Sequence, residues 1–388
     1  EIKASRDYAT NFLNSCPPNA IIFTYGDNDT YPLWYAQEVE GIRRDVRVVN
    51  LSLIAVDWYI DQLRRKINES PAIKMTMPPS SYRGNNRNQI FYYSPNQRND
   101  PMDLRSLVQF IGEDHPMRTG SGNMINGLYP TRNAFITVDK EKAVANGIVD
   151  PKDADKMVDR IPITLSDNYI MKDDAAILDI LANNLFERPI YFAVTCRPDK
   201  FQGLNDYMEL EGLALQVVPI KSTSDGTYGV IGNGRVDVDA FYDNFMNKFR
   251  FGNFDKYKLF VDRSYQPSVQ SMQLGVRRAA MQAINESKTE KGIALVDRYF
   301  EAFPAMNFPY DYRTFYMIGV YMQAGDFAKA KPHLEILAEE MIDRLEFYDT
   351  IDPSVIQSSF DTDYALSYQT MENVVNIVRQ SGDQEFLK

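Results

Sequence analysis

Two aspartates, separated by one residue, lie where they could hold a metal ion. The stretch IIFTYGDNDTYPLWYAQEVEG covers residues 21–41, and in it Asp27 and Asp29 flank Asn28 directly after a short apolar run. An Asp-x-Asp pair at the end of a strand supplies hard oxygen ligands for Mg²⁺ or Mn²⁺, and through the metal it can bind a nucleotide-sugar diphosphate. This pattern supports one hypothesis, a metal-dependent nucleotide-sugar transferase or hydrolase that uses Asp27 and Asp29.

The same residues also fit a purely structural role. Gly26 permits a tight turn after the strand, and Asp29 or Thr30 can accept the first free N–H groups of the helix that follows. We interpret the tetrapeptide as such a turn and helix cap, which assigns no metal. A third alternative, contact with a polar ligand without a metal, stays open.

Polar residues at the predicted strand ends form a wider set of candidates. Ligands of open α/β sheets bind at the carboxyl ends of the strands. We therefore predict a polar rim there, without assigning a catalytic residue or a cofactor. The rim residues are Asp27, Asn28, Asp29, Asn50, Ser52, Thr195 and Arg197.

Histidine and cysteine are too rare to build other common sites. His115 and His333 are far apart in sequence, and neither has a second His or Cys at metal-ligand spacing. Cys16 and Cys196 are the two cysteines, which excludes a disulfide scaffold and a multi-cysteine zinc site. A single bridge between them stays open.

The elements that would position the rim alternate between helix and strand. Residues 21–25 are a continuous apolar run that predicts a strand covered on both faces, and residues 45–53 (DVRVVNLSL) are predicted to be the next strand. A helix is predicted from about Tyr31 to Glu40, and another one is capped by Asp57, with Trp58 packed inward. Short links between these elements indicate a parallel sheet with right-handed crossovers.

The alternation is then interrupted and resumes. Residues 70–160 are rich in Pro, Asn, Arg and Tyr, and we interpret them as a long irregular excursion. The pattern returns beyond it, and Asn233-Gly234 predicts a hairpin turn. Residues 1–238 are thus predicted to form a Rossmann-like α/β domain, whose parallel or mixed sheet has helices on both faces.

Helical periodicity replaces the strand pattern in residues 239–388. Residues 314–340 read TFYMIGVYMQAGDFAKAKPHLEILAEE, with a glycine between two helical stretches. Irregular copies precede and follow this stretch, so we predict a domain of tetratricopeptide-like helical repeats. Such stacks bind peptides or partner domains on a concave face, and the alternative is a structural brace.

Composition limits the classes of partner. The 388 residues carry a formal net charge of -11, and their basic clusters are short and flanked by acids, which argues against nucleic acid. No apolar run approaches the roughly 18 residues needed to cross a bilayer. The sequence opens inside a helical pattern, so we expect it to be a piece of a longer protein.

Several stretches together resemble one family. They read GDNDTYPLWYAQEVEGIRRDVRVVNLSL (26–53), DWYIDQ (57–62), ILDILANNLFERPIYFA (177–193) and NKFRFGNFDKY (247–257). In them the sequence resembles multi-pass membrane proteins of the GT-C class that look like protein O-mannosyltransferases. In that family a hydrophobic half comes first, and a soluble region with tetratricopeptide-like helices follows.

The resemblance implies a role for this sequence beside an enzyme. GT-C enzymes use a lipid-linked sugar donor and carry their catalytic acid near the membrane spans, so no family catalytic residue falls in this chain. The implied fragment is an extracytoplasmic or periplasmic, membrane-anchored and non-catalytic region. It would recognise an acceptor protein or peptide, or dock to the N-terminal membrane half. The alternatives remain the metal-dependent enzyme and a pure protein–protein interaction module.

Overall fold

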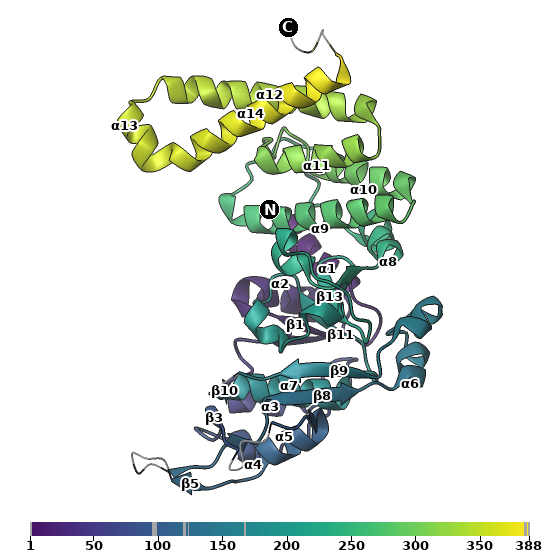
Figure 1. Ribbon diagram of the computed structural model, residues 1–388, viewed down its shortest axis with the longest axis vertical. Helices are drawn as coiled ribbons and strands as arrows, with labels where there is room; N and C mark the ends of the chain where they lie inside the picture. The colour runs from purple at the N-terminus through teal and green to yellow at the C-terminus, as the bar shows by residue number, and fades with distance from the viewer. Residues whose placement is uncertain are drawn as a thin grey trace. The chain divides into compact units, whose positions relative to one another are not determined.

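The computed structural model describes residues 2–94, 99–118, 122, 124–166, 168–383 and 386. Beyond its first three residues the chain divides into two compact units, Ala4–Asn244 and Phe245–Lys388 (Figure 1). In the described part of the chain, no helix has both the length and the apolar character that a membrane span requires.

A mixed six-stranded sheet forms the centre of the first unit. In sheet order its strands are β14 (Arg235–Val236), β12 (Met208–Leu210), β13 (Ala214–Val217), β11 (Ile190–Ala193), β1 (Ile21–Thr24) and β2 (Arg47–Asn50). β11, β1 and β2 are parallel to one another, and β13 is antiparallel to both of its neighbours. All residues of β1, β2, β11 and β13 are buried, because protein covers both faces.

Helices and smaller sheets complete this unit. The helices are α1 (Ile2–Asn14), α2 (Gly26–Glu38), α3 (Asp57–Leu63), α4 (Pro79–Tyr82), α5 (Leu104–Gly112), α6 (Lys140–Ala145), α7 (Lys172–Asn184) and α8 (Val238–Asp243), with 3-10 turns at Pro151–Lys156, Pro198–Phe201, Asn205–Tyr207 and Gly226–Gly232. α2 packs on β2, and α5 packs on α7. α7 is buried over most of its length, and Asp174 accepts a hydrogen bond from the Met171 amide at its start (3.0 Å).

The segment 70–160 contains regular structure. Three strands, β3 (Gln89–Tyr92), β7 (Leu128–Tyr129) and β10 (Tyr169–Met171), form one small sheet; β4 (Met102–Asp103), β8 (Asn133–Thr137) and β9 (Arg160–Thr164) form another; β5 (Met117–Arg118) pairs with β6 (Met124–Ile125). α4, α5 and α6 lie in the same segment. The description as an irregular excursion therefore misses much of its local order, because its strands are too short to show a clear period.

The predicted hairpin at Asn233-Gly234 is wrong. Gly226–Gly232 is a 3-10 helix, and β14 pairs in parallel with β12. Gly234 has a φ of +59°, and a Cβ there would lie 1.8 Å from the Met208 carbonyl oxygen. Glycine is thus needed for close approach of two backbones, a role that looks like a turn signal in the sequence.

The second unit is helical. Its helices are α9 (Gln266–Asn285), α10 (Thr289–Ala302), α11 (Tyr312–Gln323), α12 (Phe327–Asp349), α13 (Pro353–Val355) and α14 (Asp361–Ser381), with a 3-10 turn at Arg263–Tyr265 and π-helical turns at Asn244–Lys248 and Ile356–Phe360. α9 packs on α10, and α12 packs on both α11 and α14. Gly325 takes the left-handed conformation between α11 and α12, and Asp326 caps α12 by accepting the Lys329 amide.

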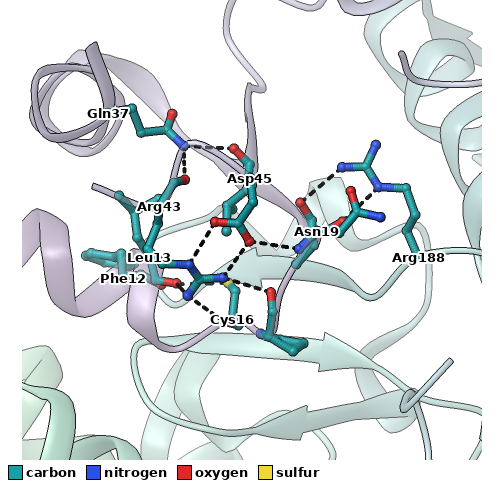
Figure 2. Close-up of polar contacts among 11 residues, drawn as sticks. Phe12, Leu13, Cys16, Asn19, Gln37, Arg43, Asp45 and Arg188 are labelled. Carbon is teal, nitrogen blue, oxygen red and sulfur yellow. Dashed lines mark hydrogen bonds and ion pairs between the residues drawn. The ribbon is translucent and has the colours of Figure 1, made fainter. Parts of the chain in front are cut away.

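One arginine connects three segments of the α/β unit (Figure 2). Nη1 of Arg43 donates to the carbonyl oxygens of Leu13 (2.8 Å) and Cys16 (2.9 Å), and Nη2 donates to that of Pro17 (3.0 Å). Nε and Nη2 also bind the two carboxylate oxygens of Asp45 at 2.9 and 3.0 Å. The end of α1, the chain entering β1 and the chain entering β2 are thereby held together.

The partners of Arg43 are themselves fixed. Asp45 accepts a further hydrogen bond from the Asn19 amide (2.9 Å), and Gln37 of α2 donates to the carbonyl oxygens of Arg43 and Val46. Burial alone would raise the pKa of Asp45, but the hydrogen bonds from Arg43 and Asn19 outweigh it and hold the pKa below its usual value. This Arg43–Asp45 network sets where β1 and β2 begin.

Replacing Arg43 should therefore destabilise the α/β unit strongly. Arg43→Ala removes a donor from three carbonyl oxygens and leaves the Asp45 carboxylate with the Asn19 amide, so we expect a loss of about 2 to 3 kcal/mol in the free energy of unfolding. Arg44→Ala is the matched control, because the neighbouring side chain is exposed. Urea denaturation measures both variants, and equal stability of the two would contradict this role of Arg43.

A cleft beside the rim of the parallel strands

The predicted cap at Gly26–Thr30 is wrong, because α2 begins five residues earlier than expected. Tyr25 precedes the helix and makes no side-chain cap hydrogen bond, and Gly26 adopts a φ of +76°. This left-handed glycine lets the strand turn directly into the helix. Asp27 and Asp29 then lie in the first turn, where their charges complement the helix dipole. Thr30 hydrogen-bonds the Thr24 hydroxyl (2.7 Å) and caps nothing.

Strand ends of β1, β2 and β11 meet as their parallel pairing requires. Nδ2 of Asn50 donates to the Gly26 carbonyl oxygen (3.1 Å), and its Oδ1 accepts from the Ser52 amide (2.8 Å). Arg197, after β11, donates to the Tyr25 hydroxyl across the same edge (3.4 Å). Asn50 thus joins β2 to the start of α2, and the rim is held by its own hydrogen bonds.

The two aspartates of the rim differ in their surroundings. Asp27 is exposed and accepts from the adjacent Asn28 amide (2.9 Å), and Asn28 and Ser52 are exposed too. Burial raises the pKa of Asp29, while the nearby Thr195 side chain and the backbone of Tyr25 act in the opposite direction.

A metal would find few ligands here. Arg197 pairs with Asp199 at 2.9 Å. Over the described ranges of the chain, no group of three His, Cys, Asp or Glu is placed to hold a metal ion. The metal hypothesis therefore depends on Asp27 and Asp29 alone.

The cysteines do not form the bridge that was left open. Cys16 and Cys196 are both free and buried. Cys16 Sγ donates to the Phe12 carbonyl oxygen (3.7 Å), and Cys196 Sγ donates to that of Phe23 (3.2 Å). Burial raises the pKa of both thiols far above the ordinary value, which makes them structural residues and poor nucleophiles.

A cleft that the sequence did not predict lies on the other side of α2. It occupies about 530 Å³ between α2 and α3, beside the edge strand β2, and we call it the β2 cleft. Its aromatic side chains are those of Tyr31, Trp34, Trp58 and Tyr59, and two arginines, Arg44 and Arg47, line it as well. Its volume lies in the range of sites that bind small ligands, roughly 300 to 1,000 Å³.

Exposed aromatic side chains distinguish this cleft. The prediction that Trp58 packs inward is wrong: its exposed fraction is 56%, and that of Tyr31 is 54%. α3 buries Tyr59, Ile60 and Leu63 instead, which leaves Trp58 on its outer side. The Tyr31 and Trp34 rings stack 5.6 Å apart. The available signal was a small group of aromatics on each helix, Tyr31 with Trp34 on α2 and Trp58 with Tyr59 on α3.

A buried arginine lies in the same cleft. Arg47 is only 3% exposed, although its side chain lines the β2 cleft. Its Nη2 donates to the carbonyl oxygens of Arg65 (2.7 Å) and Pro71 (2.8 Å). Its Nη1 is buried without a hydrogen-bond partner among the described residues. Such a donor in a native structure calls for an explanation.

Together these features describe an α/β unit with an aromatic-lined cleft along its edge strand β2, and a helical unit. The chain belongs to the family described as TMEM260-associated domain 2, whose model matches residues 5–240, more than half of the 388 residues. One relative is the Protein O-mannosyl-transferase TMEM260 of Mus musculus, which is 35% identical over 60 residues. That stretch covers 16% of this chain and 8% of the mouse protein.

These matches support part of the family resemblance, but they do not test the predicted fold classes. The relation to a protein O-mannosyltransferase supports the glycosyltransferase part of the resemblance. No solved structure matches the chain. The Rossmann-like and tetratricopeptide-like classes therefore stay predictions.

Calorimetry with Mn²⁺ and a nucleotide sugar tests the metal hypothesis. With only two acidic side chains at the start of α2, we expect no saturable heat at about 1 mM metal. One-to-one binding that disappears in Asp29→Asn would show that this expectation is wrong. Asp199→Asn is the matched control, because it removes a carboxylate from the same rim and leaves the Asp-x-Asp pair intact.

Proposed function

We propose that this chain is the extracytoplasmic, non-catalytic region of a membrane glycosyltransferase-like protein, and that its α/β unit recognises the acceptor polypeptide. The family membership and the relation to a protein O-mannosyltransferase support the link to glycosylation. The β2 cleft supports a binding role, since it exposes large aromatic side chains and is lined by Arg47, whose Nη1 has no partner among the described residues. Catalysis itself would reside in the membrane-spanning half.

The exposed aromatic side chains of the β2 cleft carry this proposal. Large aromatic groups in water are costly, and they are the residues that dominate binding energy when a partner covers them. Trp58 and Tyr31 lie on different helices, so a segment between them would contact both. A peptide chain offers the apolar contacts and amide hydrogen bonds that such a cleft can satisfy.

A second function, docking to the membrane half, is favoured by the helical unit. That unit has a cavity of about 200 Å³, which the side chains of α9, α10 and the start of α11 line. Gln266 and Gln270 from α9 and Asp311 and Arg313 beside α11 give it a polar lining. Helical hairpins commonly bind partner segments on such surfaces. The two functions use different units and can be separated by mutation.

Acceptor glycosylation by the full-length protein tests the first function. The double variant Tyr31→Ala and Trp58→Ala removes two cleft walls, and we expect transfer to the acceptor to fall about tenfold or more. Expression should stay normal, because both side chains are exposed. Tyr169→Ala is the matched control: this tyrosine is 43% exposed in the same unit and does not line the cleft. Unchanged transfer in the double variant would refute recognition at this cleft.

A further inference from the structure

Two buried arginines lie side by side near the inner end of the β2 cleft: Arg47 lines it, and Arg188 does not line it but contacts Ser70 of its wall. Arg47 and Arg188 are 3% and 6% exposed, and within the described residues neither makes an ion pair. Both donate to the Ser70 hydroxyl and to the Pro71 carbonyl oxygen, so they lie side by side. Burial, and then the charge of Arg47, lowers the pKa of Arg188 to about 10. Arg47 thus brings a positive charge to the floor of the cleft, with a second one directly beside it, in a chain of net charge -11.

The other charged side chains that line the cleft do not neutralise the positive charge of Arg47. Arg44, at the exposed side, donates to Asn68 (2.6 Å), and Asn68 in turn donates to Glu38 (2.6 Å). Glu38 is the acid that lines the cleft, and it lies beside Asn68 rather than beside Arg47. A buried cation is costly unless an acceptor or an opposite charge compensates it. Carbonyl oxygens and Ser70 compensate Nε and Nη2 of Arg47, and the acceptor that Nη1 lacks indicates what the ligand brings.

We propose that the β2 cleft binds an acidic peptide segment, in which the carboxylate of an Asp or Glu accepts a hydrogen bond from Nη1 of Arg47. The neighbouring peptide residues lie against Trp34 and Trp58. This inference rests on the proposed acceptor recognition and adds the chemistry of the segment that is recognised. Arginine suits this role because it stays charged when buried, and a hydrogen bond from a charged nitrogen to a carboxylate is stronger than one between neutral groups.

A carboxylate fits the floor better than a phosphate does. Nη2 and Nε of Arg47 are already used by Arg65, Ser70 and Pro71, so one nitrogen remains for the ligand. A phosphate presents three strong acceptor oxygens and needs several donors to leave water. One nitrogen satisfies one carboxylate oxygen, and the peptide's amide groups can use Gln62 at the side of the cleft.

Tryptophan fluorescence gives a readout confined to this site. The chain has two tryptophans, Trp34 and Trp58, and both line the β2 cleft. Emission from the whole chain is titrated with the capped peptide acetyl-Ser-Glu-Thr-Ala-amide and with its glutamine counterpart. We expect the acidic peptide to shift the emission and to bind about tenfold more tightly than the glutamine peptide. Added salt should reduce the difference only in part, because the arginine is buried.

Two variants test whether the preference for glutamate depends on Arg47. Arg47→Lys keeps the charge but loses the guanidinium, and it should reduce the preference for glutamate. Arg44→Gln changes an exposed charge at the mouth, and it should leave most of the preference intact. If Arg47→Lys does not fold, the pair of peptides on the native chain still decides the matter, because it changes only the ligand.

The outcomes separate this inference from the proposed function. Equal binding of both peptides would overturn the acidic preference and leave acceptor recognition standing. No change in emission up to about 10 mM peptide would overturn the acidic segment, while the transfer assay judges the function independently. Displacement of the acidic peptide by a lower concentration of inorganic phosphate would also contradict the inference and favour a lipid-linked phosphate.

Discussion

The arrangement of the α/β unit depends on the guanidinium of Arg43. It connects the end of α1 and the approach to β1 with Asp45 at the approach to β2 (Figure 2). Because β1 and β2 pair in parallel, fixing where both strands begin also fixes where both end. The rim at their carboxyl ends and the cleft along the outer edge of β2 are both consequences of this one network.

Three arginines in the stretch GIRRDVRVVN have three different roles. Arg43 is saturated with protein partners, Arg44 is exposed, and Arg47 is buried with one nitrogen left over. The fold explains Arg43. It does not explain Arg47, because a buried donor without a partner destabilises the folded chain. This stretch is part of one that resembles the family. Arg43 stabilises the α/β unit, and Arg47 lines the β2 cleft.

Local patterns in the sequence predicted helices and strands better than they predicted hydrogen-bond partners. The apolar run 21–25 and the stretch 45–53 led to β1 and β2, and the strand-end rule placed Asn50 and Thr195 at one edge of the sheet. The start of α2 was missed because Gly26 turns the chain directly from β1 into the helix, without a capping side chain to mark the helix start. Trp58 was placed inward because apolarity suggests burial, whereas the opposite side of α3 supplies the buried residues. Which donor stays unpaired depends on packing between distant segments, which a sequence pattern does not contain.

The central claim is that an acceptor segment lies along β2 between α2 and α3. A structure of the full-length protein with a bound acceptor peptide tests it most directly. The account predicts peptide density in the β2 cleft, in contact with both tryptophans and with an acidic side chain at Arg47. Peptide density elsewhere, with the cleft filled by another part of the same protein, would contradict it.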